Sequence, residues 1–98
     1  MIQKTLLLVE DEDAHFELIK RSIESGSNLF EIINVKTLEE AKNFIYHTNI
    51  DLILCDWRLP DGDGIDLLKF TGLAKKIPLI MMTSYGNEKF AVEAIKLG

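Results

Sequence analysis

Three of the apolar runs in this chain are followed directly by side chains that carry oxygen. These side chains are Glu10 and Asp11, then Asp56, then Thr83 and Ser84. Clustered carboxylates repel one another, by about 4 kcal/mol for two unit charges 4 Å apart at an effective dielectric constant near 20. A divalent cation removes this repulsion, and an all-oxygen cluster that keeps some water suits Mg²⁺ better than Zn²⁺. If the runs end at one edge of a sheet, these residues predict a Mg²⁺ site.

Asp56 is the candidate nucleophile of this group. A carboxylate with one free oxygen beside the cation could attack a phosphoryl group whose charge the cation also neutralises. The hydroxyl of Thr83 could donate a hydrogen bond to a phosphoryl oxygen. A simpler interpretation is that Asp56 only begins a turn, because Asp is common where chains reverse and Pro60 follows soon after. The run before Asp56 favours neither interpretation, whereas the polar ends of the other two runs favour the chemical one.

The apolar runs themselves predict buried strands. Residues 52–55 are apolar without alternation, which is typical of a strand covered on both faces in a parallel sheet. We expect strands at residues 5–9, 30–35, 52–56 and 79–82. The second of these includes Glu31 and Asn34, and this partial polarity predicts that it lies at a sheet edge.

Helical patterns follow each predicted strand. The first helix should bury Phe16, Ile19 and Ile23, joined by Leu18, and stop at Gly26. Thr37 and Glu40 have the spacing of a capping box and predict the start of the second helix, which should end near residues 47–49. The third helix should follow a loop at residues 60–64, and the fourth should begin near residue 87.

Strands that alternate with helices predict an α/β fold, a doubly wound parallel sheet with right-handed crossovers. Helices on both faces require the strand order to reverse within the sheet, and a crevice forms at the carboxyl ends of the strands beside that reversal. The sequence therefore predicts one edge at which Glu10, Asp56 and Thr83 meet.

Composition restricts the possible functions. The chain has 98 residues, the size of one small domain, and a net charge of −5, which disfavours binding to nucleic acid or to anionic membranes. No apolar run approaches the roughly 18 to 20 residues that span a bilayer, and no signal-peptide pattern is present, so a cytoplasmic location is expected. Cys55 is the one cysteine, and we expect it to be a core side chain rather than a reactive thiol.

Taken in order, these motifs resemble the receiver domain of two-component response regulators. LLLVEDE at residues 6–12 is similar to the acidic strand end of that family, and DLILCDWRLPDGDG at 51–64 to its phosphoacceptor strand and loop. PLIMMTS at residues 78–84 resembles the strand that carries its switch hydroxyl, and AIKLG at 94–98 resembles its fourth helix. The resemblance covers the whole chain.

The resemblance implies a flavodoxin-like receiver fold with strand order 2-1-3-4. Asp56 would accept a phosphoryl group from a phosphohistidine on a histidine kinase or phosphotransfer domain. Glu10, Asp11, Asp56 and the backbone carbonyl of Arg58 would hold Mg²⁺, and Thr83 would reorient to bind the phosphate. Such a domain is a phosphorylation-controlled binding switch that assists its own phosphotransfer and dephosphorylation, rather than an enzyme with a separate substrate.

The sequence departs from the family at its end. The family has a fifth strand and helix, and a lysine at the end of that strand pairs with the phosphate, whereas this sequence stops at Gly98. Residues 1–98 are therefore expected to be a receiver domain incomplete at its C-terminus. The fourth strand, residues 79–82, would be a hydrophobic edge, which predicts self-association.

Other functions stay open at this point. A module that keeps the receiver fold without phosphorylation is compatible with the absent lysine. A phosphohydrolase of the haloacid-dehalogenase type also uses a strand-end Asp, but it needs a second Asp where this chain has Arg58. Two further side chains lie near the site: Trp57 is expected to line the cleft, and His15 could reach the acidic residues, although a surface histidine is the simpler interpretation.

Overall fold

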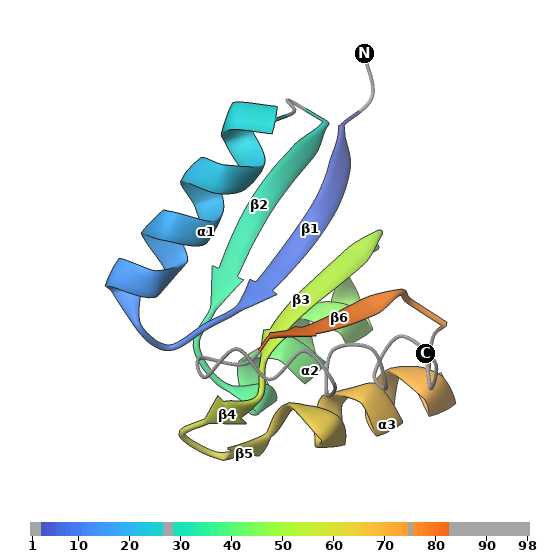
Figure 1. Cartoon of the computed structure of the whole chain (residues 1–98). Helices are drawn as coiled ribbons and strands as arrows, with labels where there is room; N and C mark the ends of the chain where they lie inside the picture. Colours follow the sequence, from blue (N-terminus) through green and yellow to red (C-terminus); the bar gives the residue numbers. More distant parts are fainter. Residues whose placement is uncertain (1–2, 27–28, 75, 83–98) are drawn as a thin grey trace.

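The computed structural model describes residues 3–26, 29–74 and 76–82. Strands and helices alternate along this part of the chain (Figure 1). Their bounds are β1 Lys4–Val9, α1 Asp13–Gly26, β2 Phe30–Val35, α2 Leu38–His47, β3 Leu52–Asp56, β4 Arg58–Leu59, β5 Gly62–Asp63, α3 Gly64–Ala74 and β6 Leu79–Met82. The fourth helix predicted near residue 87 lies outside the described residues. Among residues 3–26, 29–74 and 76–82, none of the helices has the length and apolar composition of a membrane span.

Four of the strands form one parallel sheet in the order β2-β1-β3-β6. These are the four predicted strands, so the doubly wound α/β fold and the predicted order 2-1-3-4 are confirmed. In the described sheet β2 lies at one edge, as its polar residues predicted, and β6 lies at the other. Figure 1 shows α1 on one side of the sheet and α2 with α3 on the other.

The register of the sheet explains why the acidic residues come together. Val9 at the end of β1 pairs with Cys55 in β3, so that Glu10 and Asp56 follow neighbouring positions. Asp56 in turn pairs with Met82, the last residue of β6. Parallel strands that end level with one another present their next side chains at the same edge.

The main core lies between the sheet and the helices α2 and α3. Alternate residues of β1, Leu7 and Val9, point into it, and they pack with Leu38, Ile45 and Leu67 from the two helices, among others. These apolar side chains are all at most 4% exposed, and their burial from water is the main force that fixes α2 and α3 against the sheet.

Helix α1 covers the opposite face less completely. Its residues Phe16, Ile19 and Ile23 are half-buried, and none of its residues is fully buried. The prediction that Leu18 joins this apolar stripe is wrong, because Leu18 is 63% exposed. At 100° per residue, Leu18 lies about 160° from Phe16 around the helix, away from the sheet.

The N-terminus of α2 has the predicted capping spacing. The side chain of Thr37 accepts a hydrogen bond from the backbone N–H of Glu40 at 3.1 Å, as in a capping box. The carboxylate of Glu40 accepts a hydrogen bond from the backbone N–H of Lys36, one residue before the cap, at 3.3 Å.

The segment after Asp56 is more ordered than predicted. Residues 60–64 were expected to form a loop, but Arg58–Leu59 and Gly62–Asp63 pair as a short antiparallel hairpin. Two-residue strands have no periodicity that a sequence pattern could reveal. Gly62 has a φ of +150°, a backbone conformation that residues with a Cβ atom rarely adopt. This hairpin lies between the strand that carries Asp56 and the start of α3.

Candidate functional site

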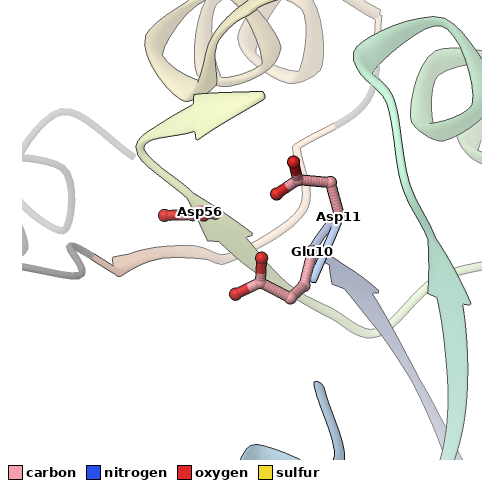
Figure 2. Close-up of side chains that lie close together, drawn as sticks. All are labelled: Glu10, Asp11 and Asp56. Carbon is pink, nitrogen blue, oxygen red and sulfur yellow. The ribbon is translucent and has the colours of Figure 1, made fainter. Parts of the chain in front are cut away.

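Glu10, Asp11 and Asp56 converge at the carboxyl end of the sheet (Figure 2). Glu10 and Asp11 come directly after β1, and Asp56 is the last residue of β3. One ligand atom from each side chain lies within 4.8 Å of those of the other two. Three oxygen donors this close together can bind a single small cation.

Two of these carboxylates are buried. Glu10 is 1% exposed and Asp56 is 6% exposed. The Oε2 atom of Glu10 accepts a hydrogen bond from the backbone N–H of Glu12 at 3.3 Å. The other oxygen of Glu10, Oε1, contacts His15. Apart from that contact, neither Glu10 Oε1 nor Asp56 Oδ1 accepts a hydrogen bond from the described part of the chain.

Buried polar atoms without a hydrogen bond are uncommon and costly in folded proteins. A cation bound between the oxygens would satisfy Glu10 Oε1 and Asp56 Oδ1 together and would also offset the repulsion between the carboxylates. The donors are all oxygen atoms, and Asp11, unlike the other two residues, is not buried, so that water can complete the coordination. This donor set suits Mg²⁺.

The surroundings of Glu10 change the pKa of its carboxyl group. Burial raises the pKa of Glu10 above its ordinary value, and the neighbouring charge of Asp56 raises it further. The backbone N–H of Glu12 and the side chain of His15 partly oppose this increase in pKa. Burial and the charge of Asp56 thus make ionisation of Glu10 less favourable than for a free carboxyl group.

His15 belongs to the surroundings of this cluster. Sequence reasoning favours a surface histidine, but the structure corrects this expectation, because His15 Nδ1 contacts Glu10 Oε1. His15 lies in the first turn of α1, and about a third of its side chain is exposed. The signal available in the sequence was its position one helical turn after Asp11.

Asn34 is a second residue near the site whose part the sequence did not reveal. Its side-chain Nδ2 donates to the backbone carbonyl of Leu8 at 2.9 Å, and it lies 3.2 Å from the carbonyls of both Glu10 and Val35. These contacts bind the end of β1 to β2 at the point where the acidic residues leave the sheet. From the sequence, Asn34 indicates only that its strand lies at a sheet edge.

The backbone after Asp56 is fixed on two sides. The N–H of Trp57 donates to the carbonyl of Met82 at 2.8 Å, and the N–H of Gly64 donates to the carbonyl of Trp57 at 2.7 Å. A Cβ atom at Gly64 would lie 2.6 Å from the carbonyl oxygen of Asp56 and 2.6 Å from the sulfur of Met81. Glycine at position 64 therefore allows α3 to begin directly beneath the strand end that carries Asp56.

The remaining predicted site residues stand as follows. Arg58 is exposed and is the first residue of β4, two positions after Asp56, and the role of its carbonyl as a cation ligand stays a prediction. Thr83 lies outside the described residues, directly after Met82, which pairs with Asp56. Cys55 is fully buried, and burial raises its pKa to about 12, which agrees with a core side chain rather than a reactive thiol.

Comparison with known proteins gives matches over the whole chain. The family described as the response regulator receiver domain matches residues 6–98. The phosphate regulon transcriptional regulatory protein PhoB of Pseudomonas aeruginosa is 35% identical over 101 residues, which cover 100% of this chain and 43% of PhoB. The response regulator protein PilR of the same organism is 32% identical over 99 residues, which cover 100% of this chain and 22% of PilR. The chain thus spans less than half the length of these relatives.

Solved structures agree with the sequence matches. The non-phosphorylated HemR receiver domain from Leptospira biflexa superposes with a TM-score of 0.77 at 30% identity, over 98% of this chain and 77% of that one. The beryllofluoride-activated NtrC4 receiver domain dimer superposes with a TM-score of 0.79 at 30% identity, over 98% of this chain and 78% of that one.

Proposed function

Because this chain belongs to the response regulator receiver domain family, we propose that it is a phosphoacceptor whose Asp56 receives a phosphoryl group. One observation carries the proposal: Asp56 is buried at a strand end, its Oδ1 atom lacks a hydrogen bond from the described residues, and two further carboxylates lie within 4.8 Å. A residue that only begins a turn would need neither the acidic neighbours nor the unsatisfied oxygen.

The reaction follows from the chemistry of a carboxylate nucleophile. An Oδ atom of Asp56 attacks the phosphorus of a phosphohistidine on a histidine kinase or phosphotransfer domain. The new P–O bond forms as the P–N bond breaks, and the departing imidazole keeps the electron pair and takes up a proton from solvent. The product is an acyl phosphate on Asp56. Thr83 would then donate its hydroxyl hydrogen to a phosphoryl oxygen.

The residues at this edge fit a Mg²⁺ ion. Glu10, Asp11, Asp56 and the backbone carbonyl of Arg58 would hold it. When bound, Mg²⁺ supplies positive charge that neutralises both the carboxylates and the incoming phosphoryl oxygens. Three carboxylates without a cation would repel a phosphoryl group, so phosphotransfer should depend on the ion.

Phosphorylation would act as a switch rather than as one step in the turnover of a separate substrate. The acyl phosphate carries roughly −1.5 to −2 charge units, in place of the single negative charge of the Asp56 carboxylate. Local changes of this kind shift the balance between two surface arrangements when one of them binds the phosphate better. The backbone bond from Trp57 to Met82 connects the phosphoacceptor segment to β6, which leads to Thr83. We place this signalling role in the cytoplasm.

Self-association through β6 is a second part of the proposal. In the described sheet β6 is an edge strand, and its four residues, Leu79–Met82, are apolar. Unpaired apolar edges readily pair with another chain, and the similar NtrC4 structure is a receiver domain dimer. Sedimentation velocity should show a dimer whose proportion grows with concentration. A single monomer species at high concentration would contradict this part.

A fluorescence titration tests the central proposal. Trp57 is the only tryptophan and directly follows Asp56, so its emission should change when Mg²⁺ is added. It should change again with beryllofluoride, which mimics a phosphoryl group on Asp56. The Asp56→Asn variant is the matched control and should lose the beryllofluoride response. A wild-type response to Mg²⁺ without one to beryllofluoride would favour a phosphorylation-silent module instead.

A further inference from the structure

The tip of the β4–β5 hairpin is bonded to the start of helix α2. Asp61 lies in the turn of the hairpin, and its Oδ1 atom accepts a hydrogen bond from the backbone N–H of Leu38 at 2.8 Å. Its Oδ2 atom accepts one from the backbone N–H of Glu39 at 3.0 Å. The first N–H groups of a helix have no partner within the helix. Asp61 therefore satisfies two of them from a position 23 residues after Leu38 and 22 residues after Glu39.

Apolar packing supports the same contact. A Cβ atom at Gly62 would lie 2.8 Å from Cδ1 of Leu38, so the hairpin backbone and this side chain are already in close contact. Leu38 is 4% exposed, and Leu59 from the other strand of the hairpin is 9% exposed. The hairpin tip is thus held to α2 by two hydrogen bonds and by a buried apolar contact. We call these interactions of Asp61 and Gly62 with α2 the hairpin latch.

The other end of the hairpin lies at the phosphoacceptor. Arg58 begins the hairpin two residues after Asp56 and pairs with Asp63. A ladder of two residues on each side is not stable by itself in water. The position of the hairpin relative to Asp56 must therefore depend on the contacts that the hairpin makes with the rest of the protein. The hairpin latch supplies its hydrogen bonds to α2.

We propose that Asp61 is a positioning residue for the cation site, because the hairpin latch sets the place of the Arg58 carbonyl relative to Glu10, Asp11 and Asp56. This inference depends on the proposed function, in which Arg58 supplies one ligand of Mg²⁺. Residues that orient metal ligands without touching the metal commonly change metal affinity by 10-fold to 100-fold when they are replaced.

Three variants test the inference by Mg²⁺ titration of Trp57 fluorescence in the full chain. Asp61→Ala removes both acceptors, and its Mg²⁺ dissociation constant should rise about tenfold. Asp61→Asn keeps one acceptor and should lie between wild type and Asp61→Ala. Thr37→Ala removes another cap of α2 without touching the hairpin. It should lower the melting temperature while leaving the Mg²⁺ dissociation constant within about twofold of wild type.

A fourth variant separates position from charge. Asp63→Ala removes the same negative charge from the same hairpin, so any general electrostatic effect on a cation appears there too. The inference predicts a clearly larger loss of affinity for Asp61→Ala. Equal losses in the two variants would overturn it, as would an unchanged dissociation constant in a folded Asp61→Ala or Asp61→Asn protein. If Asp61→Ala does not fold by circular dichroism, Asp61→Asn decides.

The two levels of the proposal fail differently in this experiment. A wild-type protein that shows no Mg²⁺ response would overturn the proposed function and the positioning role together. A wild-type protein that binds Mg²⁺, together with an Asp61→Ala variant that binds it equally well, would overturn the positioning role alone.

Discussion

Replacing Asp56 with asparagine should stabilise the protein when no divalent cation is present. Asp56 is 6% exposed and faces the carboxylates of Glu10 and Asp11. The substitution removes the charge and keeps the shape of the side chain. The resulting gain in stability would show that the wild-type site is strained by clustered negative charge, as a cation-binding site should be.

The structure gives the size of the effect. Ligand atoms of the three residues lie within 4.8 Å of one another, and two unit charges at that separation repel by about 3.5 kcal/mol at an effective dielectric constant of 20. Asp11 is not buried, so water and salt screen part of its repulsion with the other two carboxylates. We therefore expect Asp56→Asn to raise the free energy of unfolding by about 2 kcal/mol and the melting temperature by about 10 °C.

Thermal denaturation followed by circular dichroism measures this change. Wild type and Asp56→Asn are compared in EDTA and in saturating Mg²⁺, with Glu17→Gln, an exposed carboxylate on α1, as the matched charge control. Mg²⁺ at 100 times its dissociation constant should stabilise wild type by about 2.7 kcal/mol and the Asp56 variant by less. An Asp56→Asn protein that melts at or below the wild-type temperature in EDTA would refute the reasoning.

Three further results are expected. In urea denaturation, wild type should be more stable than Asp61→Asn above pH 3.8, the ordinary pKa of Asp, and should lose this advantage at lower pH. The reason is that backbone N–H groups lower the pKa of Asp61 in the folded protein. An advantage that persists in strong acid would contradict this. Gly64→Ala should lose about 1–3 kcal/mol of stability in the same assay, because its Cβ would overlap the carbonyl of Asp56. Cys55 should resist a thiol reagent at neutral pH in the native protein and react in urea, since burial raises its pKa to about 12.

The sheet could be predicted from the sequence because three of its strands, β1, β3 and β6, contain continuous apolar runs that polar residues follow. Val9, Cys55 and Met82 each close such a run. The structure places Val9 level with Cys55, and Met82 one residue further along, level with Asp56. That arrangement brings Glu10, Asp11 and Asp56 together, as the sequence had predicted. Hydrophobic burial and the geometry of parallel strands suffice for this part of the fold.

The contacts that surround the site could not be predicted, because each depends on packing between distant segments. The bonds from Asp61 to the start of α2 span 23 and 22 residues, and those from Asn34 to the end of β1 span 26 and 24. His15 was within reach of the acidic residues by helical spacing, but its contact with Glu10 depends on how α1 lies against β1.

The most direct test of the phosphoacceptor assignment is covalent labelling with a small phosphodonor such as acetyl phosphate in the presence of Mg²⁺. Intact mass should increase by one phosphoryl group in wild type, and fragmentation should locate that group on Asp56. Asp56→Asn should stay unlabelled, and wild type should stay unlabelled in EDTA. Labelling that persists in Asp56→Asn would show that another residue is the acceptor, and a wild-type protein that never gains the phosphoryl mass would contradict the proposed function.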